Sequence, residues 1–207
     1  MLDTVTAPAA LPFAVQLKAL MDLEGRYQPK LSGLRLIESS QDNGLRMTTR
    51  LRELEVKDLL SLTRFFGFSS ETFSLAISLL DRFLSVMKVC KSIITCTNNL
   101  VSYLSRNNNK SCFIKYFPCP LQIQPKHLSC VGLCCVYIAI KSTEEEKNVP
   151  LANELIRISQ RRFTVSDMMR MEKIIMEKLY WKVKAPTALR FLRLFHNNIQ
   201  EQLDAER

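Results

Sequence analysis

The sequence has few of the residues on which phosphate-binding and metal-binding proteins depend. Only five of its 207 residues are glycine, which argues against a glycine-rich phosphate-binding α/β fold and against a β fold dense in turns. With two histidines and no Cys-x-x-Cys pair, no metal site is expected. The sequence contains neither a phosphate loop nor a nucleophile motif. We therefore expect no cofactor and no enzymatic activity.

Signals for secretion and for membrane insertion are also missing. The first charged residue is Asp3, and no apolar run follows a basic start as it does in a signal peptide. The longest apolar run, around Val131–Ile140, is too short to span a bilayer. Seven cysteines, an odd number, indicate unpaired thiols in a reducing compartment. The sequence predicts a soluble protein of the nucleus and cytoplasm with no membrane partner.

Aspartate and glutamate are absent from Arg82 to Thr143. Within this stretch the segment 90–123 shows no clean helical period. Its basic residues are Lys91, Arg106, Lys110 and Lys115. These four account for four charges of the formal net charge of +9 and leave +5 for the rest of the chain. A basic chain suits an acidic partner, so a nucleic-acid-binding module stays open as an alternative, although the local origin of the charge makes it the weaker one.

Helical periodicity dominates the remaining sequence. Apolar residues at intervals of three and four predict helices over 13–24, 45–66, 71–87, 125–141, 151–159, 164–180 and 186–203. The stretch from Leu128 to Ile140 is apolar nearly all round, which is typical of a helix buried on every side. Thr164 and Asp167 have the spacing of a capping box. The sequence therefore predicts an all-α fold built around one buried central helix.

The same periodicity assigns side chains to faces. The apolar series of 45–66 includes Leu54 at helical spacing, and that of 164–180, which includes Met169, is expected to point largely inward. The three glutamates at 144–146 follow a helix end, where a charge run is expected to form a solvated surface.

Several stretches in a fixed order resemble the cyclin box, the five-helix unit with which cyclins bind protein kinases. They are "ETFSLAISLLDRFLSVMKV" (71–89), "AIKSTEEE" (139–146) and "VSDMMRMEKIIMEKLYWKVKAPTALRFL" (165–192). The run 28–68 looks most like the G-type cyclins. The resemblance implies an N-terminal loose segment and short helix (1–27), a cyclin box (28–185) and a C-terminal helix (186–207) that opens a truncated second segment.

The resemblance also implies a function and the residues that carry it. The chain would be a non-catalytic regulatory subunit that binds a cyclin-dependent protein kinase and modulates cell-cycle progression. Lys141 and Glu172 match the family's kinase-contacting lysine and glutamate, and Arg52 and Asp81 match its internal ion pair. A type 2A protein phosphatase regulatory subunit is a further partner that only the family suggests. The alternatives are a transcription-factor-like module that uses the cyclin fold, and a truncated cyclin that occupies kinase or phosphatase partners.

The sequence departs from the family at the patch with which many cyclins dock substrates. That patch is built from a methionine, a leucine and a tryptophan, and the matching positions here are Leu51, Glu55 and Asp58. Two carboxylates do not form an apolar groove, so substrate recruitment by that route is not expected.

The segment 90–123 does not fit the cyclin box. In the box register, Val89 should be followed almost directly by Gln124, whereas helix–helix connections in bundles usually have about 2–8 residues. We predict that 90–123 is a disordered insertion, and we hypothesise that it is a retained intron or a mispredicted exon. A messenger that joins the codons of Val89 and Gln124, with no longer form, is the expected observation, and abundant message with the extra codons would contradict it.

Overall fold

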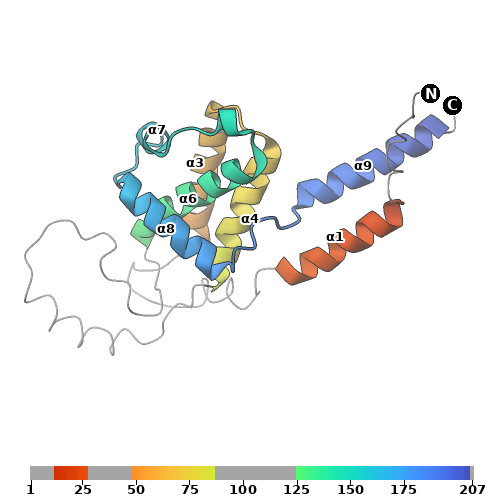
Figure 1. Cartoon of the computed structure of the whole chain (residues 1–207), viewed down its shortest axis with the longest axis horizontal. Helices are drawn as coiled ribbons and strands as arrows, with labels where there is room; N and C mark the ends of the chain where they lie inside the picture. Colours follow the sequence, from red (N-terminus) through yellow and green to blue (C-terminus); the bar gives the residue numbers. More distant parts are fainter. Residues whose placement is uncertain (1–11, 28–47, 87–124, 206–207) are drawn as a thin grey trace, which may run out of the picture. The chain divides into compact units, whose positions relative to one another are not determined.

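The computed structural model describes residues 12–27, 48–86 and 125–205 (Figure 1). These described residues form seven α-helices and one 3-10 helix, and they contain no strand. The elements are α1 (Phe13–Tyr27), α3 (Thr49–Phe65), α4 (Ser70–Val86), α6 (Pro125–Thr143), η1 (Glu146–Asn148), α7 (Ala152–Ile158), α8 (Val165–Lys178) and α9 (Ala188–Ala205). The predicted all-α fold is confirmed. The predicted insertion 90–123 lies outside the described residues and remains a prediction.

The chain divides into two compact units. One unit contains α1 and α9, which lie side by side (Figure 1) and are joined by an edge-to-face contact between Phe13 and Phe195 with ring centroids 5.4 Å apart. Among its described residues this unit buries little, with Leu20 as the buried residue of α1 and none in α9. The other unit contains α3, α4, α6, α7 and α8, and it holds the main core.

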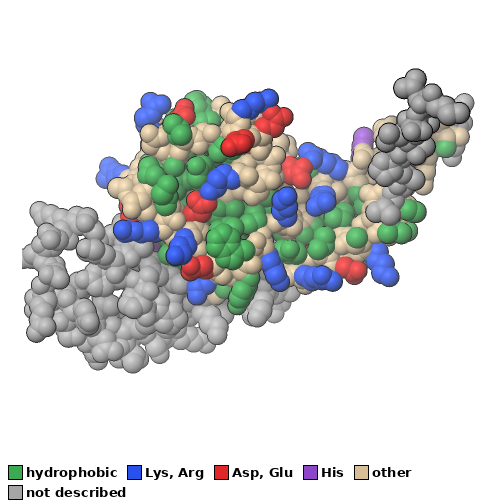
Figure 2. Space-filling model, viewed as in Figure 1, with side chains coloured by type: hydrophobic (Ala, Val, Ile, Leu, Met, Phe, Trp, Pro, Cys, Tyr) green, Lys and Arg blue, Asp and Glu red, His purple; other side chains and the backbone are tan. Residues whose placement is uncertain are grey.

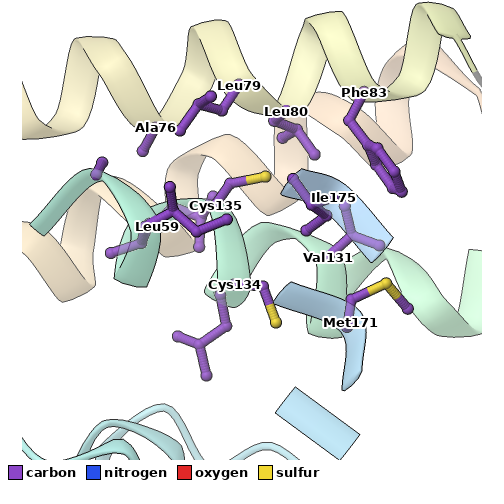
Figure 3. Close-up of a cluster of buried hydrophobic side chains, with 14 of the residues drawn as sticks. Leu59, Ala76, Leu79, Leu80, Phe83, Val131, Cys134, Cys135, Met171 and Ile175 are labelled. Atoms are coloured by element: carbon purple, nitrogen blue, oxygen red, sulfur yellow. The ribbon is translucent and has the colours of Figure 1, made fainter. Parts of the chain in front are cut away.

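Helix α6 is the centre of the larger unit. It packs against α3, α4 and α8, and α7 packs on α8 (Figures 1 and 3). The side chains from Leu128 to Ile140 are buried with few exceptions, so the predicted central helix is confirmed. Cys134 and Cys135 point into this core, where burial raises the pKa of the Cys135 thiol far above its ordinary value. These thiols therefore stay neutral and pack as small apolar groups.

Short-range hydrogen bonds set the ends of the helices. The Oγ1 of Thr48 accepts from the Leu51 N–H at 3.2 Å at the start of α3, and Gly67 follows its end with a positive φ of 70°. At the start of α8, the Thr164 hydroxyl accepts from the Asp167 N–H while the Asp167 carboxylate accepts from the Thr164 N–H. The predicted capping box is thus confirmed.

The expectation that the apolar series of α8 points inward is wrong for Met169, which is 62% exposed. Leu54, in the apolar series of α3, is likewise 51% exposed. The apolar arcs of α3 and α8 are wider than the surfaces that neighbouring helices cover, because α6 occupies only one side of each. Both side chains therefore remain on the outside of the unit.

Candidate partner-binding site

Lys141 and Glu172 lie together on the surface of the larger unit. Lys141 comes from the last turn of α6, and Glu172 comes from the middle of α8, which packs against α6. The Nζ of Lys141 donates to Oε1 of Glu172 in a direct ion pair. The two side chains are 38% and 21% exposed, so another molecule can reach both.

The end of α6 that carries Lys141 is tied to the start of α4. The hydroxyls of Thr72 and Thr143 are 2.6 Å apart, and the Glu144 carboxylate accepts from Thr72 Oγ1 and, at 3.0 Å, from the Ser69 N–H. Burial disfavours ionisation of Glu144, but the hydrogen bonds from Thr72 and Ser69 outweigh it and lower the pKa of this carboxyl. A negative charge is also favourable at the N-terminus of a helix. Glu145 and Glu146 are exposed, as expected of a solvated charge run, whereas Glu144 is partly buried and hydrogen-bonded to α4 and the residue before it.

Large apolar side chains lie exposed on and after α8. Met169 precedes Glu172 by three residues and so shares its helix face. Beyond the end of α8, Tyr180 and Trp181 are 78% and 67% exposed, and both have left-handed backbone angles with φ of 53° and 59°. The buried Arg82 of α4 holds this turn by donating to the Lys182 carbonyl at 2.7 Å. Exposed large apolar groups of this kind are typical of a protein-binding surface.

Arg52 and Asp81 meet between α3 and α4. The Nε of Arg52 donates to Oδ1 of Asp81 at 2.5 Å, and a terminal nitrogen donates to Oδ2 at 2.6 Å. The hydrogen bond to Asp81 raises the pKa of the Arg52 guanidinium, with burial opposing it. This pair joins two helices of the bundle and lies on other elements than Lys141 and Glu172.

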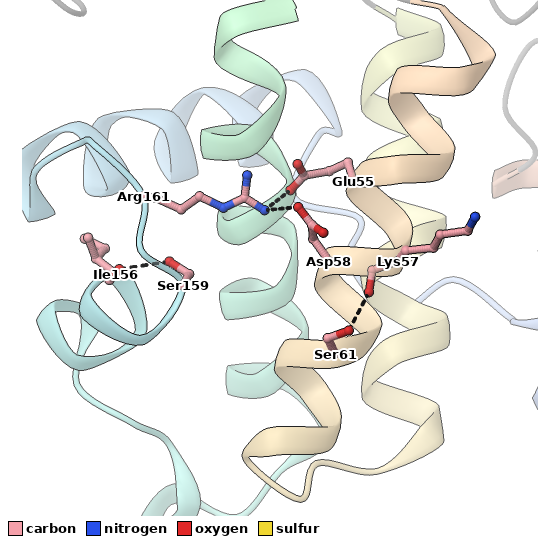
Figure 4. Close-up of polar contacts among 7 residues, drawn as sticks. All are labelled: Glu55, Lys57, Asp58, Ser61, Ile156, Ser159 and Arg161. Carbon is pink, nitrogen blue, oxygen red and sulfur yellow. Dashed lines mark hydrogen bonds and ion pairs between the residues drawn. The ribbon is translucent and has the colours of Figure 1, made fainter.

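Glu55 and Asp58 on α3 form an ion-paired cluster with Arg161, shown in Figure 4. A terminal nitrogen of Arg161 donates to Glu55 at 3.3 Å and to Asp58 at 3.2 Å. Glu55 is only 5% exposed, and this burial raises the pKa of its carboxyl, although the charge of Arg161 opposes the shift. Arg161 follows α7, far from α3 in the sequence, and no local pattern could have identified it.

A cavity of about 600 Å³ opens beside this cluster, between α3 and the loop after α7. Asp58 and Arg161 give it a charged side, and Leu62, Phe65 and Ile158 give it an apolar side. The structure does not test the expectation that substrates are not recruited here, which stays a prediction.

Within the described part of the chain, no helix has the length and apolar character needed to cross a membrane. Over the same residues, His, Cys, Asp and Glu side chains form no group of three that could hold a metal ion.

Comparisons with known proteins place this geometry in context. The family model "Cyclin, N-terminal domain" matches residues 110–184. Human Cyclin-G1 is 55% identical over 207 residues, which are 100% of this chain and 59% of that protein. Mouse Cyclin-G2 is 43% identical over 176 residues, which are 85% of this chain and 41% of that protein. The chain therefore spans less than two thirds of the length of these relatives.

Proposed function

Because the chain belongs to the cyclin family, with G-type cyclins among its relatives, we propose that it is a non-catalytic regulatory subunit that binds a cyclin-dependent protein kinase. In this role it would modulate cell-cycle progression in the nucleus and cytoplasm. Lys141 and Glu172 are the residues that we assign to kinase binding.

The observation that carries this proposal is the partly exposed ion pair between α6 and α8. The ammonium of Lys141 has three N–H donors, and Glu172 has oxygen acceptors beyond the one that Lys141 occupies. A docked helix of the partner could offer main-chain carbonyls to Lys141 and N–H groups or a basic side chain to Glu172. Exposed Met169, on the same helix face as Glu172, would supply an apolar contact next to these polar ones.

Binding of purified cyclin-dependent kinases to the wild type and to the double variant Lys141→Ala, Glu172→Ala tests the proposal. Truncating charged residues at the centre of an interface commonly costs about 2 kcal/mol or more, so we expect at least a 10-fold loss of affinity. An ion pair on the protein surface adds only about 0–1 kcal/mol to the free energy of unfolding, so the wild type and the double variant should both be folded.

The matched control removes Glu145 and Lys147, an ion pair of the same chemistry whose side chains are 69% and 76% exposed. Their double alanine variant should bind as the wild type does. Equal affinity for all three proteins would remove Lys141 and Glu172 from the kinase interface.

The other partners considered for this chain have less support. Only the family associations suggest the type 2A phosphatase subunit, and no described residue is assigned to it. For nucleic acid, Figure 2 shows basic and acidic side chains interspersed over the visible face of the helices, where phosphate binding needs a gathered basic surface. Kinase binding is therefore the function that we propose.

A further inference from the structure

The side chain of Tyr137 lies against the Lys141 ammonium. Both residues are on α6, one helical turn apart, and the Lys141 Nζ is 4.5 Å from the centroid of the Tyr137 ring. The Tyr137 side chain is partly buried and packs against the main core. The core therefore holds the ring, while the side chain of the lysine that it contacts is 38% exposed.

This contact restricts a side chain that is otherwise flexible. A lysine has four rotatable bonds, and fixing them upon binding loses conformational entropy. The face of an aromatic ring attracts a cation within about 6 Å of its centroid. Here the ring and the Glu172 carboxylate hold the ammonium together, so it is already aimed before any partner arrives.

We propose that Tyr137 is a positioning residue of the partner-binding site, and that its ring pre-orders Lys141 for contact with the partner. This inference rests on the proposed kinase binding for its function, but the pre-ordering is a property of the free protein. The competing explanation is that Tyr137 is a core residue whose nearness to Lys141 has no consequence. If Tyr137 positions Lys141, the aromatic ring itself is required. If Tyr137 only fills the core, another apolar side chain of similar size can replace it.

The first experiment measures pre-ordering in the unbound protein. The ε-CH₂ protons of Lys141 should show an upfield ring-current shift in the NMR spectrum of the wild type and of Tyr137→Phe. The shift should disappear in Tyr137→Met, a flexible apolar replacement, and Lys141→Arg identifies the resonance by its loss. Unchanged lysine shifts in Tyr137→Met would overturn the proposal. If that variant does not fold, Tyr137→Leu serves in its place.

The second experiment measures kinase affinity as a double-mutant cycle. Tyr137→Phe should bind within 2-fold of the wild type, and Tyr137→Met about 5-fold more weakly, the size expected of one cation–π contact. In a Lys141→Ala background the Tyr137→Met change should have no further effect, because the ring then has no ammonium to hold. An equal loss in both backgrounds would contradict positioning and favour a packing role. If the wild type binds no kinase, the proposed function fails, and the NMR result still decides whether Tyr137 orders Lys141.

Discussion

Arg52 and Asp81 join α3 to α4 through two parallel hydrogen bonds, a geometry that only the planar guanidinium provides. Both side chains retain some exposure, 28% and 22%, so solvent screens part of their attraction. At the scale of single residues, we therefore expect this pair to have a structural role, so that its removal lowers the free energy of unfolding.

We expect Asp81→Ala to lower the free energy of unfolding by about 1.5–3 kcal/mol, because it removes two charge-assisted hydrogen bonds and leaves the guanidinium without its partner. Arg52→Lys should lower it by less, since the charge remains but the double hydrogen bond does not. Urea denaturation followed by circular dichroism measures both. A loss within experimental error for Asp81→Ala would show that the pair has no structural role.

Glu144 gives the stability of the larger unit a defined pH dependence. Its carboxyl has a pKa below the ordinary value of 4.5, so the folded state holds its proton less tightly than the unfolded state does. Its stabilising contribution is therefore present above about pH 5 and is lost as the pH falls through the lowered pKa. The wild type should be more stable than Glu144→Gln at pH 7, and the difference should shrink towards pH 3.

Thermal unfolding of the two proteins at several pH values measures this difference. Glu146→Gln, at an exposed carboxylate two residues further on, controls for the loss of one negative charge. A difference between wild type and Glu144→Gln that stays constant with pH would mean that the contacts to Thr72 and Ser69 do not depend on ionisation.

At the scale of helices, α6 contacts α3 at a point where only glycine fits. A Cβ at Gly132 would overlap the carboxylate of Glu55, which is itself buried and paired with Arg161. Glycine inside a helix usually costs about 0.5–1 kcal/mol relative to alanine, so Gly132→Ala would be stabilising if nothing stood in its way.

We expect instead that Gly132→Ala destabilises the protein by about 1–3 kcal/mol, because the Glu55 side chain must move out of its paired position. In a Glu55→Ala background the same change should be neutral or stabilising, since the space is then free. Urea denaturation of the four proteins measures the coupling. A destabilisation of the same size in both backgrounds would show that Glu55 is not the obstacle.

Helices and contacts differed in how far the sequence could predict them. The apolar run Leu128–Ile140 and the Thr164–Asp167 spacing are local signals, and they predicted the central helix and the capping box correctly. Periodicity could not predict that Met169 is exposed, because it marks an apolar arc but not how much of that arc a neighbour covers. Ion pairs such as Arg161 with Glu55 join residues far apart in the chain, so they follow only from the packed structure.

The candidate partner-binding site was also only partly predictable from the sequence. Lys141 and Glu172 were assigned by family resemblance, and the structure brings them together from two helices. Tyr137 was not singled out, although it is one helical turn from Lys141, and Glu144, which directly follows α6, was expected to be a solvated charge. Their contacts depend on side-chain directions and on the approach of α4, neither of which a single sequence specifies.

At the scale of the whole molecule, the unusual feature is the length of chain between α4 and α6. Lengthening a connection from about 6 to about 40 residues costs roughly 2 kcal/mol of closure entropy. Deletion of 90–123 should therefore raise the free energy of unfolding by roughly 2 kcal/mol and leave kinase affinity unchanged. Urea denaturation and a binding titration measure both, and a less stable deletion protein would show that the segment contributes to the fold.

The most direct test of kinase binding through this site is a charge exchange, Lys141→Glu combined with Glu172→Lys. The exchanged protein keeps an ion pair between α6 and α8 and loses only the contact between the Lys141 ammonium and the Tyr137 ring, so its thermal stability should fall only slightly below that of the wild type. It presents the opposite charges to the partner, so its affinity for the cyclin-dependent kinase that binds the wild type most tightly should fall by about 100-fold, or ~2.7 kcal/mol, in a calorimetric titration. Equal affinity of the exchanged and wild-type proteins would contradict the account, as would the absence of any kinase that binds the wild type.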